Sequence, residues 1–293
     1  YKDPVDALSR FACMPPDSID AFFKSREKVE RAFNNLRIAL DDENRFQDWF
    51  QPEDDKLYFV HVDLAQKHDH CAVALAHVDK FVSIKVGAQT KEASPVVIVD
   101  AVRWWTPSTT ESVDFTEVKE YIQSLKHRGF NIKVVTFDRW NSHDMMQQLN
   151  AYGMPAENLS VAKKHYDDMA LVVMEERLHG PQISLLIEEL LQLRIIRDKV
   201  DHPRKGSKDL ADAVCGAVFN AISRTPTNLN QEVEIHTYDY DDEREEQEAL
   251  ARKRNNTIEL PNKRTMPDNL QDFINSMRGD DEGMQFVDNF TIL

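Results

Sequence analysis

The segment LYFVHVD, residues 57–63, marks the point where the sequence changes to short runs of β-branched and aromatic residues. Such runs are typical of β-strands. Because side chains alternate between the two faces of a strand, Asp63 lies on the same face as Phe59 and His61. An acid therefore lies inside an otherwise apolar strand, which makes Asp63 a candidate functional residue.

The pattern downstream of this segment predicts an α/β fold. We expect strands near 58–64, 72–77, 81–86, 96–105, 132–137 and 159–162, and helices near 115–127, 142–151, 167–178 and 207–222. The first strands are joined by short polar loops and form an antiparallel meander. A strand reached through a helical crossover normally lies parallel to its partner, so the later strands extend a mixed sheet flanked by helices. We assign no element to residues 183–200.

Three more aspartates share the character of the first. Asp138 follows the strand predicted at 132–137, at the carboxyl end where ligand sites of α/β sheets form. In the last predicted helix, Asp209 and Asp212 are three residues apart and therefore lie on one face. Gly216 lies one turn further along that face, where a small residue lets the helix approach the sheet closely. We expect Asp209, in the first turn, to be the more exposed of the two helical acids.

These four aspartates predict a metal centre. Clustered carboxylates repel one another unless protons or a cation neutralise them. Hard oxygen ligands suit Mg²⁺ or Mn²⁺, and two such ions about 3.5–4 Å apart stabilise both the attacking and the leaving oxygen in phosphodiester cleavage. Singly, an aspartate at a strand end is more often a cap, and Asp209 is favoured by the helix dipole. Together, the strand–strand–helix arrangement favours the metal site.

Other polar residues are weaker candidates. A turn between two predicted strands holds His68, Asp69 and His70. Asp100 interrupts an apolar strand and is compatible with a solvent-facing position on an edge strand. Basic residues near the acidic positions are candidate DNA contacts, namely Arg139, Lys163, Lys164, Arg204, Lys205 and Lys208. The sequence contains neither GxxxxGK[ST] nor GxGxxG, so it offers no support for nucleotide hydrolysis or dinucleotide binding.

Charge divides the 293-residue chain into three parts. The formal net charge is −15, and the acidic excess lies at the ends. Acids and bases number 13 and 8 in residues 1–55, 22 and 21 in residues 56–224, and 16 and 7 in residues 225–293. We expect a linker with a lead-in helix, a globular domain and an acidic flexible tail, in that order.

The apolar pattern and the cysteines bear on the compartment. No apolar run approaches the ~20 residues that cross a bilayer, and the first residues lack a signal-peptide core, so neither membrane insertion nor secretion is expected. The three cysteines lie far apart without paired spacings, which fits a reducing compartment.

Three segments resemble the acidic motifs of a known family. HVDLA (61–65), VVTFDRWNS (134–142) and HPRKGSKDLADAV (202–214) are similar to motifs of the nuclease domain of tailed-bacteriophage terminase large subunits, a branch of the ribonuclease H-like superfamily. The resemblance covers residues 56–222, and the KD-x-x-DA core of the last motif is its most specific part. It implies a metal-dependent endodeoxyribonuclease that cuts concatemeric viral DNA during genome packaging, in the cytoplasm of the infected bacterial host.

The resemblance also implies partners and residue roles. The partners are double-stranded DNA, an amino-terminal ATPase motor domain, a small terminase subunit and a portal. On this hypothesis Asp63, Asp138 and Asp212 hold one ion, and Asp209 helps to hold a second. Two alternatives stay open: a resolvase- or transposase-like nuclease on the same fold, and a non-enzymatic assembly module. A preference for DNA structure would favour the first, and metal-dependent cleavage would count against the second.

Overall fold

The computed structural model is organised around one central strand, β1 (Tyr58–Asp63). It describes residues 21–34, 36–64, 70–86, 89–107, 112–138, 142–203, 206–227 and 234–238. These ranges all belong to one compact unit, Tyr1–Tyr238. None of the helices in this described part is both long and apolar enough to cross a membrane.

The main sheet is mixed, as the order of elements predicts. Its strands follow the order β5-β4-β1-β2-β3-β6. The remaining strands of this sheet are β2 (Cys71–Val86), β3 (Gln89–Trp105), β4 (Ile132–Phe137), β5 (Ala156–Asn158), β6 (Leu178–His179) and β9 (Glu234–Tyr238). The pairs β1–β2 and β2–β3 are antiparallel, whereas β1–β4, β4–β5 and β3–β6 are parallel. The antiparallel meander with added parallel strands confirms the predicted fold class.

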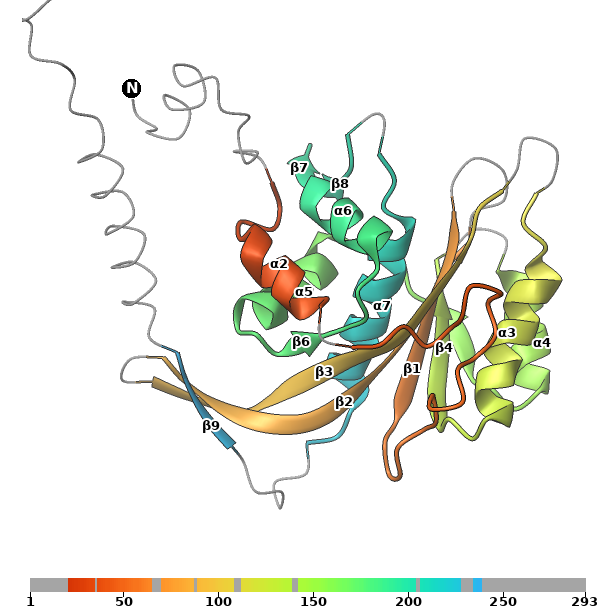
Figure 1. Ribbon diagram of the computed structural model, residues 1–293, viewed down its shortest axis with the longest axis horizontal. Coiled ribbons are helices and arrows are strands. Elements are labelled where there is room, and N and C mark those ends of the chain that lie inside the picture. The colour runs from red at the N-terminus through yellow and green to blue at the C-terminus, as the bar shows by residue number, and fades with distance from the viewer. Residues whose placement is uncertain are drawn as a thin grey trace, which may run out of the picture. The chain divides into compact units, whose positions relative to one another are not determined.

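Helices cover both faces of this sheet (Figure 1). They are α2 (Arg26–Ala32), α3 (Phe115–His127), α4 (His143–Ala151), α5 (Lys163–Met174), α6 (Ser184–Gln192) and α7 (Asp209–Arg224). Helix α7 packs directly on β1, β2 and β3, and α5 and α6 pack on α7. On the opposite face lie α3 and α4 (Figure 1).

The alternation predicted for β1 separates the two cores. Phe59 belongs to the core beneath α5, α6 and α7, whereas Tyr58, Val60 and Val62 belong to the core beneath α3 and α4. All four side chains are buried. The central strand is thus covered on both faces, and a charged residue on it must be accommodated at its end.

Several expected elements differ from the observed ones. The strands expected at 72–77 and 81–86 are one strand, β2, because a register shift at Asp79 lets the pairing continue past the polar residues. The strand expected at 159–162 lies at β5 instead, and residues 183–200 hold α6 and a hairpin. The hairpin strands are β7 (Arg194–Ile196) and β8 (Lys199–Asp201).

Two further elements lie outside the predicted central domain. Helix α2 falls within the predicted linker, and Val29 and Phe33 in this region are buried in the core under α5 to α7. Strand β9 falls within the predicted tail and pairs parallel with the end of β2. The domain boundaries at 55 and 224 stay predictions.

The close approach of α7 to the sheet occurs at Gly216, as the sequence predicts. A Cβ built at Gly216 would lie 2.2 Å from Cγ and Cδ2 of His61 on β1. Real Cβ atoms do not approach other atoms so closely, so only glycine allows this crossing. The helix backbone therefore rests on the His61 ring.

A buried polar network fixes the same crossing. Thr136 of β4 donates its hydroxyl proton to the carbonyl of Val60 (3.2 Å). Its oxygen accepts from Nδ2 of Asn220 on α7 (2.7 Å) and lies 2.7 Å from Nδ1 of His61. Since the hydroxyl has one proton, Nδ1 must carry a proton and donate. Burial lowers the pKa of His61 to about 4, so the ring is neutral at neutral pH.

Substituting Gly216 by alanine tests this crossing. At an unobstructed helical position Gly→Ala stabilises by about 1 kcal/mol. Here we expect the opposite sign, a loss of roughly 1–3 kcal/mol in the free energy of unfolding, because the methyl group overlaps the His61 ring. Denaturant unfolding measures it. The loss should shrink when the same change is made in a His61→Ala background, and a stabilised Gly216→Ala protein would contradict the close approach.

Candidate functional site

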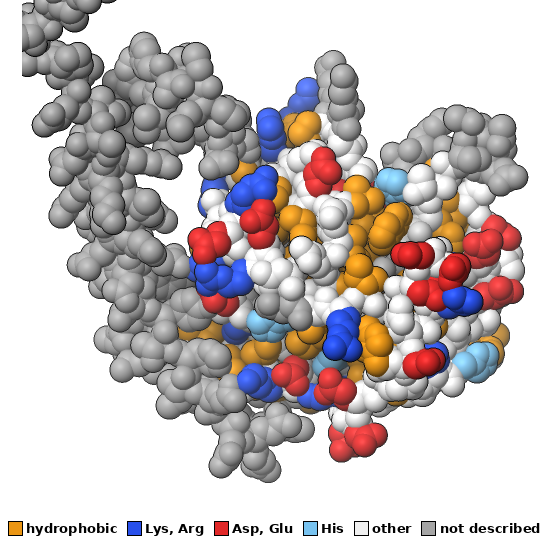
Figure 2. Space-filling view, in the orientation of Figure 1, with side chains coloured by type: hydrophobic (Ala, Val, Ile, Leu, Met, Phe, Trp, Pro, Cys, Tyr) orange, Lys and Arg blue, Asp and Glu red, His pale blue; other side chains and the backbone are white. Residues whose placement is uncertain are grey.

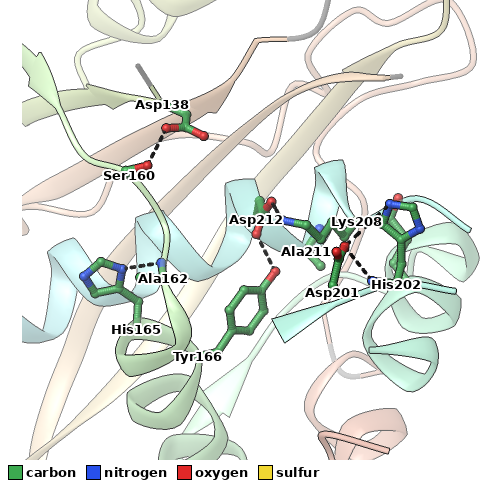
Figure 3. Close-up of polar contacts among 11 residues, drawn as sticks. Asp138, Ser160, Ala162, His165, Tyr166, Asp201, His202, Lys208, Ala211 and Asp212 are labelled. Carbon is green, nitrogen blue, oxygen red and sulfur yellow. Dashed lines mark hydrogen bonds and ion pairs between the residues drawn. The ribbon is translucent and has the colours of Figure 1, made fainter. Parts of the chain in front are cut away.

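Two of the predicted acids lie side by side at strand ends. Asp63 ends β1, and Asp138 directly follows β4. The two strands are parallel neighbours, with Val62 opposite Phe137, and the amide of Asp138 donates to the carbonyl of Val62 (3.3 Å). The hydroxyl of Ser160 donates to Oδ1 of Asp138 (2.8 Å; Figure 3). The ends of β1 and β4 that carry these two acids are therefore neighbours in the sheet.

Helix α7 supplies the other two acids. Asp209 is its first residue, and Oδ2 of Asp209 accepts the backbone N–H of His70 (2.8 Å). Asp209 is buried, so the expectation of an exposed first turn is wrong. The reason is tertiary: the backbone leading into β2 lies against the beginning of α7, which sequence periodicity does not report.

Asp212 is held by two neighbouring side chains. The hydroxyl of Tyr166 on α5 donates to its Oδ1 (2.6 Å), and Nζ of Lys208 forms an ion pair with its Oδ2. Figure 3 shows the Tyr166 ring rising from α5 toward Asp212 on α7. Tyr166 is fully buried and belongs to the same core cluster as Leu210 and Ala211 of α7. Asp212 is therefore fixed in position by donors from two sides.

The four carboxylates share one electrostatic environment. Burial raises the pKa of Asp63 well above its usual range; the charges of Asp212, Asp209 and Asp138 raise it further, while Lys208 opposes them. Burial also raises the pKa of Asp212, although Lys208 and Tyr166 favour its charged form. Burial lowers the pKa of Lys208, but the neighbouring carboxylates outweigh burial, and its net pKa is raised. The site is thus short of positive charge.

This donor set fits a hard divalent cation. Carboxylate oxygens are the ligands that Mg²⁺ and Mn²⁺ prefer, and a cation would relieve the repulsion that raises these pKa values. Among the described residues, no three of these aspartates bring ligand oxygens within 4.8 Å of one another in the metal-free chain, whereas Glu53, His77 and Asp79 have ligand atoms that close. The ammonium of Lys208 supplies the compensating charge at Asp212.

A buried glutamate positions the acids of α7. Glu189 of α6 accepts the backbone N–H of Ala211 with Oε2 (2.9 Å) and the hydroxyl of Ser207 with Oε1 (2.5 Å). A carboxylate at this place satisfies unpaired N–H groups and is favoured by the helix dipole. Sequence reasoning missed Glu189 because its stretch had no assigned element. Only the packing of α6 on α7 identifies its role.

The predicted DNA contacts divide into two groups. Arg139, Arg204 and Lys205 lie outside the described residues. Lys164 is exposed, whereas Lys163 pairs with Asp167 (2.8 Å) and Lys208 with Asp212. Their role in DNA binding stays a prediction.

Helix α2 presents a mixed surface. In Figure 2 acidic and basic side chains alternate over this helix. The ion pairs Arg26–Glu30 and Arg31–Glu27 account for this alternation. We therefore do not assign this face to DNA.

Comparison with known proteins gives distant similarities. No family model matches the chain. It is 26% identical over 252 residues to Uncharacterized protein MJ0330 of Methanocaldococcus jannaschii, covering 79% of this chain. The chain spans 43% of the length of that relative.

Solved structures of bacteriophage terminases are similar to the chain in fold. The large terminase of bacteriophage HK97 has a TM-score of 0.49 and 16% identity, covering 68% of this chain and 43% of that one. The large terminase nuclease of thermophilic phage G20c has 0.46 and 14%, with 68% and 97% covered. The nuclease domain of Thermus phage P74-26 has 0.48 and 12%, with 70% and 98% covered. All three are distant similarities, with less than 25% identity and TM-scores below 0.5.

Proposed function

We propose that this chain is a divalent-metal-dependent DNA endonuclease whose active site is formed by Asp63, Asp138, Asp209 and Asp212. The observation that carries the proposal is the gathering of carboxylates from β1, β4 and α7 in one partly desolvated place, where burial and mutual repulsion raise the pKa values of Asp63 and Asp212. Purely structural carboxylates are usually paired, and their pKa values are lowered rather than raised.

Each side chain has a distinct task in this proposal. Asp63, Asp138 and Asp212 hold one Mg²⁺ or Mn²⁺ ion, and Asp209 helps to hold a second. When bound, such ions activate water and neutralise the scissile phosphate. Tyr166 and Lys208 keep the Asp212 carboxylate in place, and Ser160 does the same for Asp138. Lys208 also brings a positive charge next to Asp212.

The biological role follows from the resemblance to terminases. We propose that the substrate is concatemeric viral DNA, cut during genome packaging in the cytoplasm of the infected bacterial host. An amino-terminal ATPase motor, a small terminase subunit and a portal are the proposed partners. The resemblance covers the nuclease part only, so these partners belong to the whole protein rather than to the described domain.

Plasmid cleavage tests the proposed activity. We expect the purified chain at micromolar concentration to nick or linearise supercoiled plasmid with Mn²⁺ or Mg²⁺, and EDTA to abolish the reaction. Asp63→Asn and Asp138→Asn should reduce the rate by at least about 10²-fold, since each removes a charged ligand. Asp201→Asn is the matched control, because Asp201 is near Lys208 but half-exposed. Intact plasmid in both metals between pH 7 and 9 would count against an active isolated chain.

The two acids of α7 are expected to differ. Asp212→Asn should abolish cleavage at every metal concentration, because Asp212 is proposed as a ligand of the first ion. Asp209→Asn keeps an oxygen that can accept the His70 amide, so it weakens only the second ion. Higher Mn²⁺ should therefore restore part of its activity by mass action. Metal titrations of the cleavage rate distinguish the two variants, and an active Asp212→Asn enzyme would overturn the assignment.

The raised pKa values predict a pH dependence of stability without metal. A carboxyl whose pKa is higher in the folded than in the unfolded state destabilises the fold as pH rises, because the folded state binds protons more tightly. Asp63→Asn removes one such group. At pH values above the raised pKa, and in EDTA, the Asp63→Asn variant should melt about 2–4 °C higher than the parent. This is the shift that about 1 kcal/mol produces in a domain of this size. The difference in melting temperature should disappear at acid pH, where Asp63 is protonated. A variant less stable than the parent at pH 8 would contradict the idea that the buried Asp63 charge destabilises the metal-free fold.

A further inference from the structure

A second group of potential metal ligands lies at the other end of β1. Glu53, His77 and Asp79 each offer one ligand atom, and these atoms all lie within 4.8 Å of one another. His77 pairs with Tyr58, the first residue of β1, whereas Asp63 is the last. The five residue steps between them correspond to roughly 17 Å along the strand. The group is therefore distinct from the aspartates proposed for cleavage.

The imidazole of His77 is the decisive feature of this group. The ring is buried, with 1% of its side chain exposed, and its Nδ1 lies 2.8 Å from Oδ2 of Asp100 on β3. Its other nitrogen, Nε2, is buried and has no hydrogen-bond partner. A buried nitrogen without a partner loses its hydrogen bonds to water and gains none in return, so it requires an explanation.

Asp100 orients the ring as metal-bound histidines are oriented. Metal-ligating histidines commonly donate the N–H of the free ring nitrogen to a carboxylate, which fixes the tautomer and makes the other nitrogen more basic. With Nδ1–H donating to Asp100, Nε2 presents its lone pair.

Irregularities in the β2–β3 ladder set the direction of two acids, Asp79 and Asp100. Leu75 faces Ala101 and Ala76 faces Val99, which leaves Asp100 without an opposite residue. A second register shift, between Val78 and Lys80, leaves Asp79 unpaired in the same way. Such bulges turn a side chain away from its regular direction and are frequent beside functional sites. Asp79 and Asp100 thus both lie at bulges, close to the buried His77.

Glu53 joins the group from the segment that precedes β1. Its backbone N–H donates to the hydroxyl of Tyr58 (2.8 Å), which holds this segment against the sheet. Lys56 is the competing charge: its Nζ lies 3.1 Å from Oδ1 of Asp79 and also donates to the carbonyl of Asp79. Within the described part of the chain Lys56 is bonded to Oδ1 of Asp79 and not to the second carboxylate oxygen, so Lys56 weakens a cation site here without blocking it.

We propose that Glu53, His77 and Asp79 bind a divalent transition-metal ion, of which Zn²⁺ is the representative, with Asp100 as the residue that positions the imidazole. A nitrogen ligand beside two carboxylates favours Zn²⁺ over Mg²⁺, which prefers oxygen alone. Three protein ligands leave room for water on the ion. Bound metal would fasten the segment before β1 to β2 and thereby stabilise the domain.

Zinc titration of the full chain tests this site. The experiment uses an Asp63→Asn/Asp212→Asn background, which removes two acids of the proposed nuclease site, and follows binding by calorimetry and by the melting temperature. We expect one Zn²⁺ per chain and a higher melting temperature with Zn²⁺ than with Mg²⁺. Glu53→Gln should weaken Zn²⁺ binding at least about tenfold and remove the thermal shift. Asp54→Asn, an exposed acid next to Glu53, is the matched control and should leave both unchanged.

Two further variants sharpen the result. Lys56→Met should tighten Zn²⁺ binding, because it removes the ammonium from Asp79. His77→Gln should abolish Zn²⁺ binding. It should also remove the visible d–d absorption of Co²⁺ bound in place of Zn²⁺. Because His77 is buried, its variant can fail to fold; Glu53 is exposed, so Glu53→Gln remains decisive. Unchanged Zn²⁺ affinity in folded Glu53→Gln protein would overturn the proposal, whatever the outcome of the cleavage assays.

Discussion

The contact between α7 and β1 at Gly216 is the constraint on which the site depends. Without a side chain at Gly216 the helix rests on the His61 ring, and the Thr136–Asn220 hydrogen bond holds it there. The beginning of the same helix is thereby brought to the ends of β1 and β4. A helix displaced by even one methyl group would carry Asp209 and Asp212 away from Asp63. The positions of the Asp212 and Asp209 carboxylates are therefore set by Gly216, which lies one helical turn from Asp212 and two from Asp209.

This arrangement stabilises α7 at both ends but leaves the charged form of Asp212 unfavourable. Glu189 satisfies backbone N–H groups at the start of α7, and Asn220 is buried in the network further along. Between them, Asp212 has Lys208 and Tyr166 as donors, yet burial still raises its pKa. Sites that bind cations commonly keep such unfavourable charge in the free protein, since rigid surroundings prevent the carboxylates from moving apart.

Much of the framework could be predicted because it depends on local patterns. Strand alternation located Asp63 relative to Phe59, and the three-residue spacing placed Asp209 and Asp212 on one face. The residues that position these acids could not be predicted, because Tyr166 and Glu189 act through contacts between helices that no local pattern encodes. Asp100 is instructive: its sequence context is compatible with a solvent-facing edge position, but two-residue strand β6 pairs with that edge and Asp100, at a bulge, contacts His77. Such a short strand has no periodicity to detect.

The two ends of β1 differ in the chemistry they offer to a cation. At the Asp63 end the donors are carboxylate oxygens, and Lys208 competes for them. At the Tyr58 end an imidazole nitrogen joins two carboxylates, and Lys56 competes for one of them. Hard ions such as Mg²⁺ prefer the first set, and borderline ions such as Zn²⁺ prefer the second. One strand can thus separate two cations by ligand type alone, so that an ion stabilising the fold need not occupy the carboxylates proposed for catalysis.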